Sequence, residues 1–291
     1  FKEDSIKAIE GVEWIPAWGE DRIKGMVNDR SDWCISRQRT WGVPIPVVYC
    51  KDCGKPVVNE KTITAISEMF RKEGANSWYI RDAKEFIPSD VKCECGCGEF
   101  IKEKDIFDVW FDSGVTHAAV MEERGYDVPV DLYLEGADQY RGWFQSSLLT
   151  SVATKNRAPY KAVCTHGWVV DGEGKTMHKS LGNGVAPNEV YDVYGADILR
   201  LWVASSDYHA DIRISKEILK QLSDTYKKIR NTARFILGNL GDATGFDVEK
   251  DIVDVKDLHE IDKWALVRLN SLIEKCKSAY DAFDFHIVVH S

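Results

Sequence analysis

Two clusters of cysteine constrain the fold of this sequence more than any other feature. Cys50 and Cys53 lie in VVYCKDCGKP with C-x2-C spacing. About forty residues later, Cys93, Cys95 and Cys97 lie in VKCECGCGEF. Two such turns can direct four thiolates at one zinc ion, which is structural because no coordination position stays open. We expect the first pair to bind Zn2+ with Cys93 and Cys95. The alternatives are Cys97 in place of either one, or five metal-free thiols.

The composition is that of a globular protein. With 291 residues, 44% hydrophobic and 29% charged, the chain can bury a substantial core. The net charge of -9 argues against binding nucleic acid by bulk charge, although a local basic surface stays possible. The sequence contains no run of eighteen apolar residues and begins with FKEDSIKAIE, so we expect no membrane span, no secretory signal and a cytoplasmic location.

The first third of the chain contains a connector and an insert. Residues 1–47 are rich in Trp, Pro and Gly and predict a connector that ends in a strand near residues 46–49. Residues 48–107 form the cysteine-bounded insert. Within it, the apolar spacing of TITAISEMFRKEG predicts a helix that ends at Gly74.

Strands and helices then alternate over residues 108–185. DIFDVWFDSG and DVPVDLYLEG each predict a strand followed by a turn, RGWFQSSLLTSVA predicts a helix, and YKAVCTHGWVV predicts another strand. This alternation is typical of an α/β fold with a mostly parallel sheet, whose strand ends carry the ligands.

The remainder of the chain is predicted to be helical. Residues 186–215 form a contact segment, and residues 216–291 begin a helical domain. Ser215 is the expected N-cap of a long helix that ends at Gly238, and a last helix starts near Asp257. Both ends of the sequence interrupt predicted elements, so we expect a fragment of a longer chain.

The stretch DGEGKTMHKS contains a Gly-Lys-Thr that is similar to a phosphate-binding loop. A Walker A loop requires G-x4-G-K-[ST], but Val169 stands five residues before Gly174, where the first glycine belongs. The P-loop interpretation therefore fails.

The same stretch resembles the KMSKS signature loop of class I aminoacyl-tRNA synthetases. Met177, Lys179 and Ser180 keep the pattern. Thr176 stands where the family has its first lysine, and His178 where it has its first serine.

Other segments resemble the same family in the same order. They are RSDWCISRQRTWGVPIP, DVWFDSG, YLEGADQYRGWFQSSL, HGWVVDGEGK and LGNGVAPNEVYDVYGADILRLWVASSDYHADIRIS. RQRTWGVPIP together with SSDYHADIRIS favours the isoleucine branch over the valine and leucine branches. The resemblance implies the second half of a Rossmann-like catalytic domain with a zinc-knuckle insert, followed by the start of an α-helical anticodon-binding domain.

The resemblance also implies a reaction. Isoleucine is activated by ATP with Mg2+ to isoleucyl-adenylate and is then transferred to tRNA(Ile). Lys179 is expected to contact the phosphates and stabilise the leaving pyrophosphate, although a loop lysine is by default a solvated charge. The loss of a lysine at Thr176 weakens the charge of this loop.

Residues around the predicted strand ends are expected to line the adenylate site. By resemblance these are Glu135, Gly136, Asp138 and Gln139, for which helix capping is the alternative role.

Three aromatic residues complete the expected site. Trp110 and Trp143 are expected to form apolar walls for the isoleucine side chain, with core packing as the alternative. His166, followed by Gly167, resembles a histidine that contacts the adenylate, with a buried core histidine as the alternative.

The sequence contains no His-x-Gly-His, the second phosphate-binding signature of this class. We therefore expect no measurable amino-acid activation from this segment alone. The alternatives are a valyl or leucyl enzyme of the same class and a non-catalytic zinc-knuckle module that binds RNA or protein.

Overall fold

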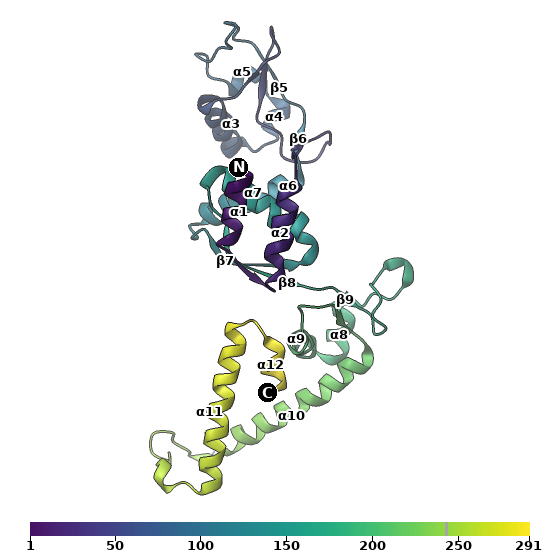
Figure 1. The fold of residues 1–291 in the computed structure, drawn as a ribbon, viewed down its shortest axis with the longest axis vertical. Coiled ribbons are helices and arrows are strands. Elements are labelled where there is room, and N and C mark those ends of the chain that lie inside the picture. Colours follow the sequence, from purple (N-terminus) through teal and green to yellow (C-terminus); the bar gives the residue numbers. More distant parts are fainter. Residues whose placement is uncertain (242–243) are drawn as a thin grey trace. The chain divides into compact units, whose positions relative to one another are not determined.

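The computed structural model describes residues 1–241 and 244–291, which divide into two units, Phe1–Cys164 and Thr165–Ser291 (Figure 1). The first unit contains α1 (Lys2–Glu10), β1 (Glu13–Ile15), α2 (Trp18–Asn28), β2 (Ser36–Arg37), β3 (Val48–Cys50), β4 (Pro56–Val57), α3 (Glu60–Glu73), α4 (Ser77–Ile80), α5 (Ala83–Phe86), β5 (Phe100–Lys102), β6 (Ile106–Phe107), α6 (Val109–Gly114), η1 (His117–Met121), η2 (Glu122–Arg124), β7 (Val130–Gly136), η3 (Ala137–Arg141), α7 (Trp143–Lys155) and most of β8 (Tyr160–His166).

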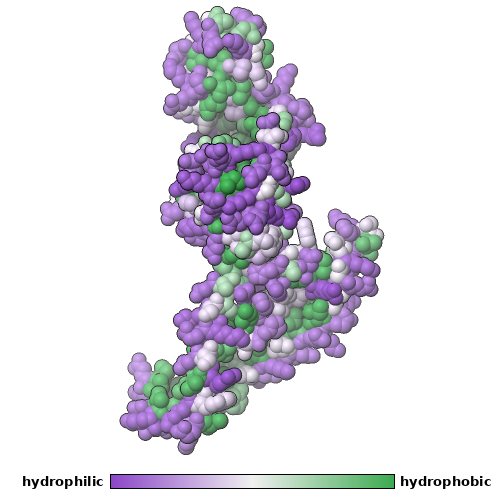
Figure 2. Space-filling model, viewed as in Figure 1, coloured by the Kyte–Doolittle hydropathy of each residue, from purple (hydrophilic) through white to green (hydrophobic). Residues whose placement is uncertain are grey.

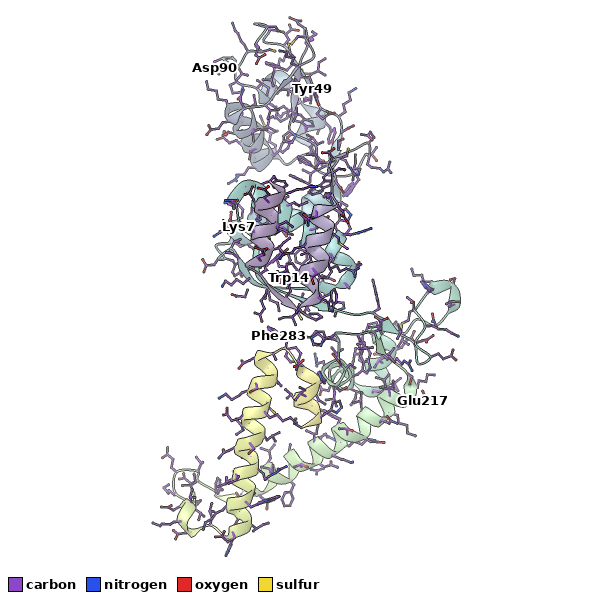
Figure 3. The ribbon with its side chains drawn as sticks, viewed as in Figure 1. Lys7, Trp14, Tyr49, Asp90, Glu217 and Phe283 are labelled. Carbon is purple, nitrogen blue, oxygen red and sulfur yellow. The ribbon has the colours of Figure 1, made fainter. Side chains whose placement is uncertain are left out.

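A three-stranded sheet of order β1–β8–β7 carries the main core of the first unit. Strand β1 runs parallel to β8, with Trp14 opposite Val163. Trp14 is buried, its indole nitrogen donates to the carbonyl of Ile9 at 3.1 Å, and its ring centroid lies 6.0 Å from those of Tyr140 and Tyr160 (Figure 3). Residues 2–28 thus form part of this core. The sequence did not predict these elements, because a strand of three residues gives no alternation to detect.

The cysteine-bounded insert has a separate small core. Strand β3 pairs antiparallel with both β4 and β5, and the buried rings of Trp78 and Phe86 pack beside this sheet. Helix α3 begins where the side chain of Asn59 accepts from the backbone N–H of Thr62 at 3.0 Å. It ends before Gly74, which adopts a φ of +82°. The predicted helix and its glycine stop are confirmed.

The DIFDVWFDSG segment differs from the prediction of a strand followed by a turn. Strand β6 is only two residues long, and it pairs antiparallel with β2. The rest of the segment forms the short helix α6, because the Asp108 carboxylate caps it by accepting from the backbone N–H of Trp110 at 3.1 Å. The mixed α/β class is confirmed, but antiparallel pairs accompany the parallel ones.

The second unit is mostly helical. It contains the end of β8, β9 (Val169–Val170), η4 (Lys179–Leu181), α8 (Pro187–Tyr194), α9 (Ala196–Ser205), β10 (Ile212–Arg213), α10 (Lys216–Leu240), η6 (Val255–Asp257), α11 (Glu260–Asp281) and α12 (Phe285–His290). Strands β9 and β10 pair in parallel, and α12 packs against α9 and α11.

Helix α10 begins as predicted but ends later. The hydroxyl of Ser215 accepts from the backbone N–H of Ile218 at 3.3 Å, which confirms the N-cap. The predicted stop at Gly238 is wrong, because the helix continues to Leu240. Gly238 has open space around it and no positive φ, so it does not form the left-handed cap on which the prediction relied.

A helical bundle is not confirmed within the part of the chain that the structure describes. Large apolar side chains of α10 and α11, among them Phe235, Leu237, Trp264 and Val267, are exposed. Figure 2 shows hydrophobic residues at the surface of this helical part. Across residues 1–241 and 244–291, none of the helices combines the length and the apolar character needed to cross a membrane.

Candidate functional site

The end of strand β7 presents the first group of predicted site residues. Glu135 and Gly136 are the last two residues of the strand, and Asp138 and Gln139 follow on η3. Glu135 is exposed, and its Oε2 accepts from the backbone N–H of Gly136 at 3.1 Å. The carboxylate has no cation partner among the described residues, so it is free to bind a positively charged group.

Gln139 connects this strand end to helix α7. Its Oε1 accepts from the backbone N–H of Trp143 at 3.0 Å, and its Nε2 donates to the Asp138 carboxylate at 2.9 Å. Gln139 thus satisfies one of the free N–H groups at the start of the helix, as the capping interpretation expects. Its amide plane is fixed in the process.

Trp143 is held on both its ring face and its nitrogen. The ring stacks on Tyr133 with centroids 3.9 Å apart and an interplanar angle of 12°. Its indole N–H donates to the carbonyl of Ser113 at 3.0 Å, and the Thr116 hydroxyl lies at 3.3 Å. One face of the Trp143 ring therefore packs against the core, which matches the core-packing alternative for that face.

Trp110 is different, because 42% of it is exposed. Its ring packs directly over Gly142, where a Cβ atom would lie 2.8 Å from the ring and 2.6 Å from Oε1 of Gln139. The structure thus brings Trp110, Gln139 and Trp143 together around Gly142. Sequence reasoning missed Gly142, although a glycine between an arginine and a tryptophan within a matched motif was the available signal.

Substituting Gly142 by alanine tests this packing. The added methyl group meets the Trp110 ring, so we expect the free energy of unfolding to fall by about 1–3 kcal/mol and the Trp110 ring to shift. Denaturant unfolding of the variant measures the first effect. Gly25→Ala in α2 is the matched control, because a Cβ at Gly25 meets nothing within 4 Å. Equal stability of the Gly142→Ala and Gly25→Ala variants would contradict the close packing of Trp110 on Gly142.

The second unit contains His166, Gly167 and the predicted signature loop. His166 ends β8, and its Nδ1 lies 2.8 Å from the carbonyl oxygen of Gly167. The N–H of Gly167 donates to the carbonyl of Tyr208 at 2.8 Å. A Cβ on Gly167 would lie 2.4 Å from the carbonyl oxygen of Ala210, so the two backbones approach as only glycine permits. His166 is half-buried and does not belong to a hydrophobic core of the described residues.

The loop after β9 is closed by two polar side chains. Asn183 accepts from the backbone N–H of His178 at 2.9 Å and donates to the Asp171 carboxylate at 2.8 Å and to the carbonyl of Thr176 at 3.2 Å. Asp171 also accepts from the backbone N–H of Lys175 at 2.9 Å. The hydrogen bond from Asn183, then that from Lys175, holds the pKa of Asp171 below its ordinary value. Sequence reasoning assigned no role to Asp171.

The two lysines of this loop have different environments. Lys175 pairs with Glu173 at 2.7 Å. Lys179 opens η4 and is exposed, and its ammonium group makes no hydrogen bond or ion pair with the residues that the structure describes. Lys179 is therefore available for an anionic ligand. Met177 is partly buried against the core of α8 and α9, whereas Ser180 is exposed.

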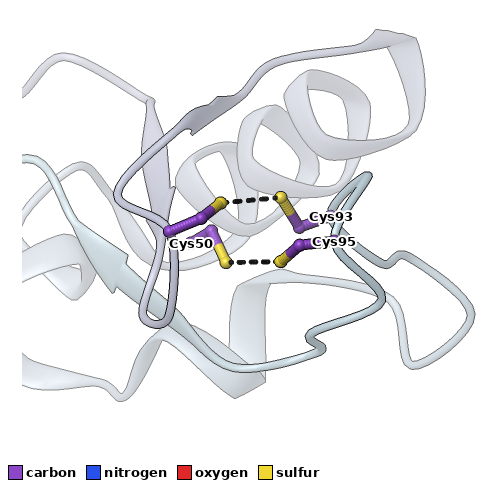
Figure 4. A group of neighbouring side chains, drawn as sticks. Cys50, Cys93 and Cys95 are labelled. Atoms are coloured by element: carbon purple, nitrogen blue, oxygen red, sulfur yellow. Dashed lines mark hydrogen bonds between the residues drawn. The ribbon is translucent and has the colours of Figure 1, made fainter.

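Four cysteines of the insert form a compact group. The Sγ atoms of Cys50, Cys53, Cys93 and Cys95 all lie within 4.8 Å of one another. Cys50 is 3.5 Å from Cys95, and Cys53 is 3.5 Å from Cys93 (Figure 4). A tetrahedral zinc with Zn–S bonds of about 2.3 Å separates its sulfurs by about 3.8 Å, so this group fits the ion.

Cys97 lies outside this group. Its Sγ accepts from the backbone N–H of Glu99 at 3.3 Å, and its carbonyl accepts from the N–H of Cys93 at 2.9 Å, which closes the turn. Backbone hydrogen bonds from Cys53 and then Asp52 lower the pKa of Cys50 to about 6. The turn thus stabilises the thiolate form of Cys50, which is the form that binds metals.

Known sequences include relatives that align with the whole of this chain. Two relatives named isoleucine–tRNA ligase, from Caldanaerobacter subterraneus subsp. tengcongensis and Natranaerobius thermophilus, are 59% and 57% identical over the whole chain. The chain spans 31% of the length of each.

Two solved structures have the same fold. The LeuRS–tRNA–LeuAMS ternary complex from Agrobacterium radiobacter K84 has a TM-score of 0.65 at 22% identity, and the match covers 89% of this chain and 34% of the other. Mycobacterium tuberculosis methionyl-tRNA synthetase in complex with methionyl-adenylate has a TM-score of 0.61 at 17% identity, covering 96% and 45%. A family model described as tRNA synthetases class I (I, L, M and V) matches residues 1–215. The chain therefore belongs to the class I tRNA synthetases.

Proposed function

We propose that the complete protein is an isoleucine–tRNA ligase, which forms isoleucyl-adenylate from isoleucine and ATP and transfers isoleucine to tRNA(Ile). The identity of 55–59% over the whole chain to relatives with that name carries the proposal. The site in this segment has groups of the charge and shape that the reaction needs. Its place of action is the cytoplasm, where translation occurs.

The first step joins two anionic substrates. The isoleucine carboxylate attacks the α-phosphate of ATP, and pyrophosphate leaves, so the enzyme must neutralise charge and align the reactants. Lys179 contacts the phosphates and stabilises the charge on the leaving pyrophosphate. Mg2+ accompanies ATP as part of the substrate. Thr176 and His178 contribute hydrogen bonds where the family has a lysine and a serine.

The other residues hold isoleucine and the adenylate. The exposed Glu135 carboxylate binds the ammonium group of isoleucine, and Gly136 permits close approach of the backbone. Asp138 and the fixed amide of Gln139 bind polar groups of the adenylate. Trp110 and Trp143 face the aliphatic side chain.

His166 and Gly167 lie at the end of β8. The imidazole of His166 contacts the adenylate from the end of β8. Gly167 keeps that strand end close to residues 208–211, which fixes the backbone position of the neighbouring His166.

The four-thiolate group holds a structural zinc. Its ligands come from both ends of the insert, so the ion joins the β3–β4 turn to the turn before β5. With four thiolates bound, the zinc has no open position and takes no part in the reaction. Its function is to fix the fold of residues 48–107.

Isoleucine-dependent ATP–pyrophosphate exchange by the full-length protein tests the proposal. We expect isoleucine to support exchange with a KM about fourfold or more below that of valine, because one additional buried methylene favours it. Leucine, with the same volume but a different branch point, is the shape control. Equal or faster exchange with valine or leucine would contradict the isoleucine assignment. Absence of exchange with all three would favour the binding-module alternative, which the sequence relatives do not support.

A further inference from the structure

The buried carboxylate of Asp108 links the segment of Trp33 and Arg37 to helix α6, which carries Trp110. Asp108 lies between β6 and α6 and is only 4% exposed. Its Oδ2 accepts from Nη2 of Arg37 at 2.6 Å and from the indole N–H of Trp33 at 2.9 Å. Its Oδ1 accepts from the backbone N–H of Trp110 at 3.1 Å. A carboxylate this buried requires such partners, because burial removes its hydration.

Arg37 is itself held in place by the backbone. Its Nη1 donates to the carbonyls of Cys34 at 2.6 Å and Ser36 at 2.8 Å. The N–H of Asp108 donates in turn to the carbonyl of Ile35 at 2.7 Å. The guanidinium group therefore meets Asp108 in one orientation, and the ion pair fixes α6 relative to the segment that precedes the insert.

Helix α6 presents or anchors both tryptophans of the site. Trp110 is its second residue, and the Asp108 carboxylate binds its N–H directly. Ser113, on the same short helix, accepts the indole N–H of Trp143 at 3.0 Å. A helix of six residues has little stability of its own, so its cap and its ion pair decide where these two side chains lie.

We propose that Asp108 is a positioning residue for amino-acid binding, acting through α6 to set the gap between Trp110 and Trp143. This role rests on the proposed function. The carboxylate does not touch the substrate, because Arg37, Trp33 and the α6 backbone use its oxygens. Loss of the Asp108 carboxylate loosens the pocket for the isoleucine side chain and leaves the phosphate-binding loop intact.

The test is Asp108→Asn in the full-length enzyme. Asparagine keeps a cap acceptor for α6 but removes the charge that pairs with Arg37. We expect the KM for isoleucine to rise about tenfold in pyrophosphate exchange, while kcat and the KM for ATP stay within about twofold. Arg37→Gln is expected to give the same change, and the double variant to be no worse than either single one, because both remove one interaction.

The matched control is Asp131→Asn, which removes an exposed carboxylate paired with Lys161 at 2.7 Å. We expect no change in the KM for isoleucine in this variant. If Asp108→Asn does not fold, Arg37→Lys carries the test, because it keeps the charge and loses the geometry.

The outcomes separate the two proposals. An unchanged KM for isoleucine in the Asp108 and Arg37 variants, or an equal rise in both KM values, would overturn the positioning role alone. Failure of the unsubstituted enzyme to exchange with isoleucine would overturn the proposed function and, with it, this role.

Discussion

Replacing Lys179 by alanine in the full-length enzyme is expected to lower kcat for isoleucine-dependent pyrophosphate exchange about 100- to 1000-fold. Lys179 is the loop lysine whose ammonium group has no partner among the described residues, so it is available to the phosphates. The positive charge of Lys179 stabilises the transition state more than the bound substrates, because negative charge builds up on the leaving pyrophosphate in the transition state. The KM for isoleucine should therefore change far less than kcat.

Lys175→Ala is the matched control for this prediction. Lys175 lies four residues earlier in the same loop, but its ammonium group pairs with Glu173 at 2.7 Å. We expect its kcat to stay within about threefold of the unsubstituted enzyme, since an exposed ion pair contributes little. A Lys179 variant that exchanges as fast as the Lys175 variant would show that the motif is misassigned.

Removing the zinc is expected to have the second large effect. Cys50→Ser takes away a ligand whose thiolate the backbone stabilises, so the zinc content should fall from about one per chain to near zero. The insert should then open, because the ion joins segments about forty residues apart in sequence. We expect limited proteolysis within residues 48–107 to accelerate at least about tenfold. Metal analysis and peptide mapping measure the two effects.

Cys97→Ser provides the control for the zinc prediction. Its thiol lies in the same turn but outside the group of four, so we expect full zinc content and an unchanged cleavage rate. Loss of zinc from this variant as well would place Cys97 among the ligands. Purified full-length protein without zinc would contradict the metal site itself.

The helix ends that depend on neighbouring residues could be predicted from local sequence signals. Helix α3 was predictable because its apolar spacing and its glycine stop at Gly74 are both local to the helix. The cap at Ser215 was predictable for the same reason. The stop at Gly238 was not, because a glycine ends a helix only if the chain beyond it turns away.

The candidate site was predicted as a set of residues but not as an arrangement. The motif match gave Glu135, Gln139 and Lys179. It did not give Gly142 or Asp171, whose roles depend on contacts within the fold. In particular, nothing local to Gly142 indicates that the ring of Trp110, 32 residues earlier, lies against it.

The sequence by itself determined the family, the mixed α/β class, helix α3, the N-cap of α10 and the two pairs of cysteines. Each of these features depends on the order and spacing of residues that are close together in the sequence. Only the tertiary structure decided that Cys97 lies outside the thiol group, that β1 belongs to the central sheet, and that Asp108 joins Arg37 to the helix of Trp110. These features depend on which distant segments meet, and a buried charge finds its partner only when the chain has folded around it.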